Sequence, residues 1–260
     1  MQTLARSAFV LILLTSTAAL HADVARSLAE LARQADFVAL AQVRDTDYLQ
    51  RRGIPVSGSA YLRVLIAYKT EKEEPGWPGP DPASGPGSAP GSGSGATSGE
   101  TVVEVYEQGL RAGECYFPNP SVLEEGRRYL VLLRRDPGHA ERFRGLPEGC
   151  AIDVLVDGAN GYAVRMPITG IRLGEAQTAQ LERLARPMQF SDPCAVADDE
   201  DLPPALRDAM LAAGQIVPFT PAAAAGNGLP QAPVAPARSW LYTQGIRLAD
   251  LRALLESGSP

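Results

Sequence analysis

The chain has 260 residues, with 24 Lys and Arg against 30 Asp and Glu, and a formal net charge of −6. A mildly acidic chain without a basic block argues against nucleic acid as a partner. Its apolar share of 45% is ordinary and is enough to build one hydrophobic core.

The first 22 residues have the layout of a secretory signal peptide. Arg6 supplies a positive start, an apolar run follows over 9–14, and small residues end the segment at Ala22. The run is shorter than the roughly 20 residues that cross a bilayer, and no later stretch reaches that length. We therefore expect a signal peptide over 1–22, a mature chain from Asp23 without a membrane span, and an exported, periplasmic or extracellular protein. An uncleaved N-terminal anchor is the alternative.

The pattern of residues 23–69 predicts one helix and two strands. Apolar residues recur at helical spacing over Val24–Ala35, with Asp23 as the N-cap. The apolar run Phe37–Val43 is typical of a buried strand. After a polar connection, Tyr61–Lys69 alternates and predicts a half-buried strand. We expect its inner side to comprise Leu62, Val64, Ile66 and Tyr68.

Residues 75–99 consist almost entirely of Pro, Gly, Ser and Ala, with Trp77 among them. Such a segment buries too little apolar area to offset the entropy of ordering. We expect a flexible insertion between two paired strands. Trp77 is either exposed or a small recognition element.

Strand patterns resume directly after this insertion. Thr101–Tyr106 alternates, and Gly126 marks a turn into the apolar run Tyr129–Leu133. Two further strands, 151–156 and 162–168, flank a hairpin turn that is rich in Gly, Asp and Asn. With the two earlier strands this predicts a mostly β fold with peripheral helices (α+β). We expect a small OB-like antiparallel barrel or twisted sheet over residues 23–175.

The remaining residues, 176–260, predict a helical C-terminal extension. Proline and glycine end two helical patterns, and leucines line one side of a third. We expect helices over Ala176–Arg186, Pro203–Ala213 and Ile246–Leu255, a Pro/Ala-rich linker over 218–237 and a short strand over Ser239–Thr243. The last helix should dock back on the sheet.

Three cysteines follow the expected signal peptide: Cys115, Cys150 and Cys194. An odd number in an exported chain predicts one disulfide and one remaining thiol. Three pairings are open, and we favour Cys115–Cys150 because both residues lie at the edges of strand-like runs in one segment. The acidic residues 198–201 disfavour a reactive thiolate at Cys194. We expect Cys194 to be buried or to pair between molecules.

The sequence contains no HExxH, CxxC, GxSxG or P-loop motif. His139 lies in a polar turn, and the GxGxxA match at 91–96 falls in the low-complexity insertion, where that fingerprint has no structural context. Acidic groups at Asp45 and Asp47, and at Asp192 with 198–201, would suit a cation. A solvated loop explains the first group, and an acidic stretch before a helix, favoured by the helix dipole, explains the second. We assign no catalytic, cofactor-binding or metal-ligating residue.

Arginines make the middle of the chain locally basic. They form either an anion-binding face or a sheet surface of mixed charge, and the acidic chain favours the second. The residues concerned are Arg111, Arg127, Arg128, Arg134, Arg135, Arg142 and Arg144.

The region 35–156 resembles the netrin-like module, the OB-type barrel of tissue inhibitors of metalloproteinases. The residues that carry the resemblance are the first strand 35–43, Cys115, the turn Leu123–Gly126, Tyr129 with Leu130, and Cys150. The resemblance implies the barrel fold, and exported bacterial proteins of this layout show it too. It does not imply protease inhibition, because those inhibitors begin with a zinc-chelating Cys and no Cys precedes Cys115 here.

These observations favour an exported binding or interaction protein that acts through a β-barrel surface, with a protein or envelope component as partner and no cofactor. The first alternative is a carboxylate-dependent hydrolase of the cell envelope, which needs two acidic groups in one pocket. The second is a structural, envelope-associated protein. A pocket that held two or more of Asp45, Asp47, Glu104, Asp153 and Arg165 would count against the binding interpretation, and a closed barrel without such a pocket would exclude the hydrolase. Asp153 and Asp157 alternate with apolar residues, so we expect them to face solvent.

Overall fold

The computed structural model describes residues 27–70, 100–109, 115–120, 126–219 and 239–256. The expected signal peptide 1–22, the insertion 75–99 with Trp77, and most of the expected linker 218–237 lie outside these residues.

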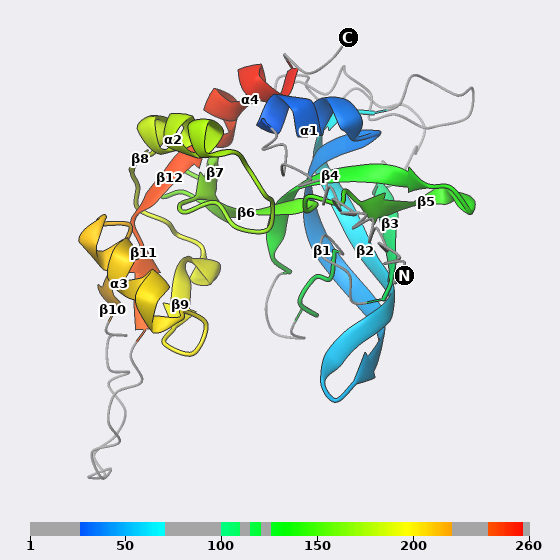
Figure 1. The fold of residues 1–260 in the computed structure, drawn as a ribbon, viewed down its shortest axis with the longest axis horizontal. Coiled ribbons are helices and arrows are strands. Elements are labelled where there is room, and N and C mark those ends of the chain that lie inside the picture. The colour runs from blue at the N-terminus through cyan, green and yellow to red at the C-terminus, as the bar shows by residue number, and fades with distance from the viewer. Residues whose placement is uncertain (1–26, 71–99, 110–114, 121–125, 220–238, 257–260) are drawn as a thin grey trace, which may run out of the picture.

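Five strands close a small barrel (Figure 1). They are β1 (Phe37–Arg51), β2 (Ile54–Lys69), β3 (Val102–Gln108), β4 (Arg128–Asp136) and β5 (His139–Gly145). Neighbouring strands run antiparallel from β1 to β2 to β3, β5 lies parallel to β3, and β4 joins β5 back to β1. The predicted fold class, a mostly β protein with peripheral helices and a small OB-like barrel, is confirmed.

Both faces of β4 are buried, because the strand stands between two cores. Tyr129, Val131 and Leu133 point into the barrel. Leu130 and Leu132 point outward into a second apolar cluster that helices cover. This arrangement explains why the sequence of β4 is continuously apolar rather than alternating.

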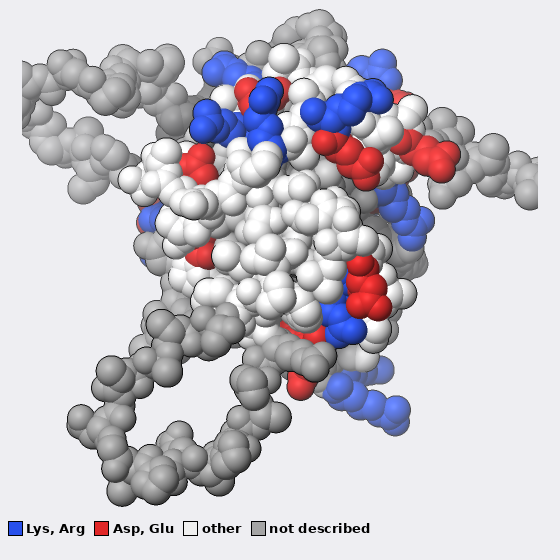
Figure 2. Space-filling model, turned by 90° about the vertical axis from the view of Figure 1, so that its left-hand side faces the viewer, with Lys and Arg blue, Asp and Glu red and all other residues white. Residues whose placement is uncertain are grey.

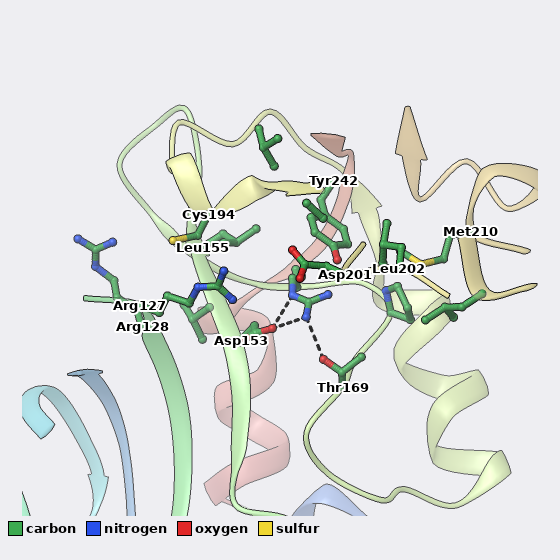
Figure 3. A pocket seen from close by; sticks show the side chains of 16 residues that line it. Arg127, Arg128, Asp153, Leu155, Thr169, Cys194, Asp201, Leu202, Met210 and Tyr242 are labelled. Atoms are coloured by element: carbon green, nitrogen blue, oxygen red, sulfur yellow. Dashed lines mark hydrogen bonds and ion pairs between the residues drawn. The ribbon is translucent and has the colours of Figure 1, made fainter. Parts of the chain in front are cut away.

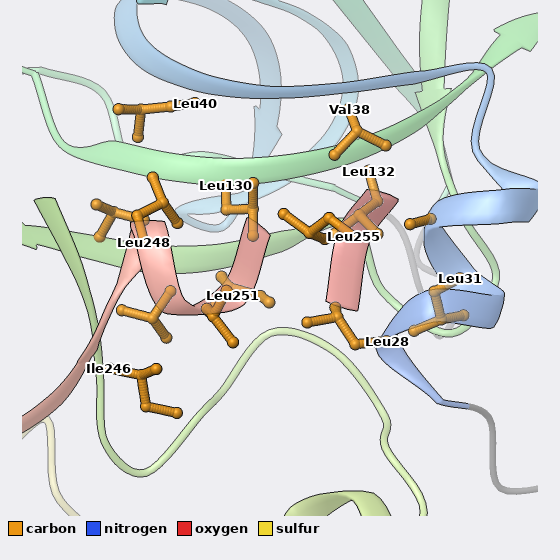
Figure 4. Close-up of a cluster of buried hydrophobic side chains, with 14 of the residues drawn as sticks. Leu28, Leu31, Val38, Leu40, Leu130, Leu132, Ile246, Leu248, Leu251 and Leu255 are labelled. Atoms are coloured by element: carbon orange, nitrogen blue, oxygen red, sulfur yellow. The ribbon is translucent and has the colours of Figure 1, made fainter. Parts of the chain in front are cut away.

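The sheet continues outward from β4 through β6 (Ala151–Val156), β7 (Tyr162–Arg165), β12 (Gln244–Arg247) and β8 (Arg186–Pro187). Three helices accompany this extension: α1 (Leu28–Gln34), α2 (Glu175–Leu184) and α4 (Leu248–Glu256). Figure 4 shows Leu28 of α1 and the α4 residues Leu251 and Leu255 packed around the outward leucines of β4. Helix α4 therefore docks on the sheet, as predicted.

A C-terminal lobe packs beside the extended sheet. It contains η1 (Pro193–Ala195), β9 (Val196–Asp198), α3 (Pro204–Ala212), β10 (Ile216–Phe219) and β11 (Ser239–Tyr242), with β11 between β10 and β9. Met210, Ile216 and Trp240 form its small core. Figure 2 shows the side of the molecule on which this lobe lies. The middle of the surface in this view is largely uncharged, and charged side chains gather toward its edges.

Several predicted boundaries of the first helix and the first two strands are wrong. Helix α1 begins at Leu28, where Ser27 is the N-cap and its hydroxyl accepts from the Glu30 amide at 3.1 Å. The expected polar connection between the first strands is a tight turn at Arg52 and Gly53, both with positive φ, so β1 and β2 form a long hairpin. Asp23, the predicted cap, lies outside the described residues.

The predicted one-sided face of β2 is also wrong. A register shift pairs Leu40 with Ile66 and Ala41 with Val64. Leu62 and Val64 consequently face the barrel interior, while Tyr68 packs against the helix-covered core. Ile66 is 40% exposed. An irregularity of one residue turns the following side chains to the other face of a strand.

Three further corrections concern the second half. His139 begins strand β5 instead of lying in a turn, although its side chain is exposed as expected. The strand predicted over 162–168 ends at Arg165, and Ile246 belongs to β12 rather than to the last helix. The described residues between 176 and 256 include five short strands besides the helices, and Pro218 lies in β10. Short pairings of this kind leave no periodic signal.

Candidate functional site

A cavity of about 330 Å³ lies between the extended sheet and the C-terminal lobe (Figure 3). Strands β6 and β7 supply one wall, and the lobe supplies the other. Charged and apolar side chains meet there. The charged residues are Arg127, Arg128, Asp153, Arg165 and Asp201, and the larger uncharged ones include Leu155, Cys194, Leu202, Leu206, Met210 and Tyr242.

The sheet register brings Asp153 and Arg165 together. Val154 of β6 pairs with Val164 of β7, so the adjoining residues Asp153 and Arg165 are cross-strand neighbours. Because side chains alternate along a strand, these two point away from the core in which Val154 and Val164 are buried. Asp153 does alternate with apolar residues as predicted, but it faces the C-terminal lobe and its side chain is only 20% exposed.

Arg165 is held by three groups. Its Nε donates to Asp153 Oδ2 at 2.6 Å, and a terminal nitrogen donates to Thr169 Oγ1 at 3.0 Å. Its guanidinium also lies over the Tyr242 ring, 4.6 Å from the centroid. Burial raises the pKa of the Tyr242 hydroxyl, so that group remains neutral. Asp153 and Arg165 thus compensate each other's charge at the floor of the cavity.

Arg128 is compensated in the same way. It forms an ion pair with Asp192 at 3.2 Å. Asp192 also accepts from the backbone amides of Cys194 at 2.9 Å and Val156 at 3.3 Å. These contacts tie the turn of η1 to the sheet, so Asp192 has a structural role at the base of the lobe.

Arg127 and Asp201 stand apart from these pairs. Both line the cavity and both are exposed. Arg127 shares a hydrogen bond with the Tyr129 hydroxyl; burial acts to lower the pKa of this guanidinium, but Tyr129, Cys194 and Asp153 outweigh it and raise the pKa. Within the described part of the chain, neither Arg127 nor Asp201 forms an ion pair.

The structure brings together two of the five residues named as pocket candidates, Asp153 and Arg165. Asp45 and Asp47 lie on the exposed half of β1. Glu104 is on β3, where it accepts from Ser59 Oγ at 2.5 Å. The carboxylates considered for a hydrolase therefore do not converge as a group.

The first two residues of the acidic run 198–201 are bound to protein donors. Asp198 accepts from Ser239 Oγ at 3.1 Å. Asp199 accepts from Arg207 at 2.7 Å and from the Trp240 indole at 3.0 Å. No group of three His, Cys, Asp or Glu suited to a metal ion occurs among the residues that the structure describes. These contacts favour the structural explanation of the run over the calcium one.

The cysteines and the arginine cluster can be placed as well. Cys115 and Cys150 lie at disulfide distance, with Cα atoms 5.9 Å apart, and Cys194 is the cysteine outside this pair. Arg142 and Arg144 form ion pairs with Asp136 at 2.6 and 3.2 Å. This part of the cluster is a surface of mixed charge, whereas Arg127 and Arg128 belong to the cavity.

Sequence reasoning missed Asp201, Tyr242 and the apolar wall as parts of one site. Arg127 and Asp201 were considered only as members of larger charged groups. The signal near Asp201 that the sequence does contain is the acidic run 198–201, which indicates a turn before a helix. In the structure, Asp201 stands directly before the buried Leu202. Nothing in the local pattern places that turn opposite the start of β4.

Comparisons of the chain with protein-family models, with curated proteins and with solved structures each find no match. In the described part of the chain, none of the helices has the length and apolar character needed to cross a membrane.

Proposed function

We propose that the protein is an exported binding protein that holds a small ligand in the cavity between the extended sheet and the C-terminal lobe. The cavity volume of about 330 Å³ lies in the range of small-molecule sites. Its walls combine aliphatic side chains with a few polar groups that can orient a ligand. Export agrees with the N-terminal segment and with the disulfide-distance pair Cys115 and Cys150.

The observation that carries this proposal is the ion pair at the cavity floor. The cavity does hold Asp153 and Arg165, and two such residues in one pocket were the condition that counts against a binding protein. A general base, however, needs an oxygen that can accept a proton from substrate or water. Asp153 Oδ2 accepts from Arg165, and the pair is fixed further by Thr169 and Tyr242, so Asp153 offers at most its other oxygen, and the second acid of the cavity, Asp201, belongs to the lobe. A rigid, charge-compensated floor suits binding better than proton transfer.

The structural, envelope-associated alternative gains less support. Such a protein needs no cavity, and the Pro/Ala-rich linker expected over 218–237, which would give it reach, lies mostly outside the described residues. The resemblance to the netrin-like module adds a barrel and no activity. The partner that we propose is a small molecule of the envelope rather than a protein.

The test is ligand-induced stabilisation of the purified protein, measured as the shift in melting temperature across a library of small polar and apolar compounds. Leu206 lines the cavity on α3 and is 41% exposed, so Leu206→Trp fills space without disturbing a core. Ala209→Trp, on an exposed position of the same helix, is the matched control.

Compounds that stabilise the original protein and Ala209→Trp, but not Leu206→Trp, support the proposal. If a compound still raises the melting temperature of Leu206→Trp, it binds outside the cavity, and the proposal is overturned. If no compound stabilises the protein, the proposal is overturned in favour of the structural alternative. If a bound compound is turned over, it is overturned in favour of the hydrolase.

A further inference from the structure

Two charged residues of opposite sign, neither with an ion-pair partner among the described residues, belong to opposite parts of the cavity. Arg127 directly precedes β4 of the barrel, and Asp201 lies in the turn between β9 and α3 of the lobe. Both side chains are exposed, and in the described residues they pair neither with each other nor with another charged side chain. Arg127 uses one donor on the Tyr129 hydroxyl, and a guanidinium has five.

The other charges of the cavity are already matched. Arg165 is paired with Asp153, and Arg128 with Asp192. A ligand that enters therefore meets one available cation and one available anion. A purely anionic ligand would be repelled by Asp201, and a purely cationic one by Arg127.

Next to Asp201, the lobe side of the cavity is apolar. Leu202 and Met210 are almost fully buried, and Leu206 beside them is partly exposed. Figure 3 shows Leu202 beside Asp201 and Met210 beyond it, on the side of Asp201 that faces away from Arg127, while Arg127 lies across the cavity beyond Asp153. A ligand whose cationic end lies at Asp201 can therefore place an apolar group against this aliphatic surface, chiefly at Leu206.

We propose that the ligand is a small zwitterion with an apolar side chain, namely a free amino acid or a short peptide with both termini free. Its carboxylate binds the Arg127 guanidinium, its ammonium group binds the Asp201 carboxylate, and its side chain contacts Leu202 and Leu206. This inference rests on the proposed function and names the ligand class of that cavity.

The first experiment compares free and capped ligands by calorimetric titration. The probes are L-leucine and L-leucyl-L-leucine, together with their N-acetylated and C-amidated forms. Each cap removes one charge-assisted contact, so each should weaken binding by about tenfold to a hundredfold. Equal binding of the free and both capped forms would overturn the zwitterion.

The second experiment exchanges the charges. Arg127→Glu and Asp201→Lys should each abolish binding of the best probe, because one terminus then faces a like charge. The double variant Arg127→Glu/Asp201→Lys offers the same two charges in exchanged places. A zwitterion can bind turned end for end, so the double variant should bind more tightly than either single variant. Matched controls are Arg186→Glu on β8 and Glu200→Lys, both exposed and outside the cavity.

The outcomes separate the two proposals. If a compound without two opposite charges binds and Leu206→Trp prevents it, the binding function stands and the zwitterion is wrong. If no compound depends on Leu206, both are wrong. If the double variant binds no better than the single variants while remaining folded by circular dichroism, the assignment of Arg127 and Asp201 to the ligand termini is overturned.

Discussion

Arg165 on β7 donates from Nε to Asp153 on β6 across 2.6 Å, and the two side chains form the charged floor of the cavity. Both are largely shielded from solvent, with 16% and 20% of their side-chain surfaces exposed. In such surroundings an ion pair is worth little net stability, but an isolated charge is costly. The pair therefore gives the cavity a fixed shape at a small energetic gain.

This relationship predicts an asymmetric response to mutation. Asp153→Asn leaves the Arg165 charge without its carboxylate and should lower the free energy of unfolding by about 1–3 kcal/mol. The double variant Asp153→Asn/Arg165→Gln should cost less than the sum of the two single changes. Urea titrations of the four proteins measure this, and strict additivity would show that the pair is not coupled.

Acid stability should depend on Asp136, which is 3% exposed. Burial alone would raise the pKa of this carboxyl, but the Gly138 amide and the guanidinium groups of Arg142 and Arg144 outweigh it and lower the pKa to about 2. Because the pKa of Asp136 is lower in the folded protein than in the unfolded chain, its carboxylate stabilises the fold at pH values above the ordinary pKa. This stabilisation is lost as the pH falls toward 2.

The variant Asp136→Asn should accordingly lose about 2 kcal/mol at pH 7. Its difference from the original protein should shrink as the pH falls from about 4 to 2, because the carboxyl of the original protein then becomes protonated. Unfolding titrations at several pH values give the comparison. Asp45→Asn, at an exposed position of β1, should change the stability at pH 7 by less than about 0.5 kcal/mol. A difference that persists unchanged at pH 2 would contradict this account.

Breaking the Cys115–Cys150 link should destabilise the barrel. The two residues are separated by 35 positions, and a cross-link over such a loop is worth about 4 kcal/mol in the loop-entropy treatment. The double variant Cys115→Ser/Cys150→Ser should therefore unfold at clearly lower denaturant, and reducing agent should do the same to the original protein. Cys194→Ser retains the pair and should respond to reductant as the original does; a reductant effect that vanishes in this variant would implicate Cys194 instead.

Gly126 should tolerate no side chain. A Cβ there would lie 1.7 Å from the Val43 carbonyl oxygen, and neither backbone can move freely because the Val43 amide donates to Arg127 at 3.0 Å. We expect Gly126→Ala to cost about 2–3 kcal/mol through overpacking. At Gly138 the nearest atom is 3.5 Å away, so Gly138→Ala is the control. Similar denaturation midpoints for the two variants would show that the strands separate more easily than their contacts indicate.

Much of the fold was predictable from local patterns. Alternation marked β3 and β6, and continuous apolar runs marked β4 and the first half of β1, because a pleated strand exposes successive side chains to opposite faces. The helices α2 and α3 were predicted to within two residues, since Pro and Gly punctuate their ends. Strands β5, β8, β9, β10 and β12 were not predicted: the last four have only two to four residues each, and β5 consists mostly of polar residues.

The candidate site was less predictable. Asp153 and Arg165 were recognisable as two charged residues flanking one hairpin, and the register of that hairpin brings them together. Arg127 and Asp201 belong to segments 74 positions apart, and only the packing of the lobe against the extended sheet makes them walls of one cavity.

By itself, the sequence determined the mostly β architecture, the cysteines suited to one cross-link and the hairpin that carries the cavity floor, because these follow from local periodicity and turn chemistry. Tertiary structure decided the closure of the barrel, the second core around α1 and α4, and the cavity. Those features depend on contacts between residues far apart in the chain, and the hydrophobic burial that drives such contacts has no direction along the sequence.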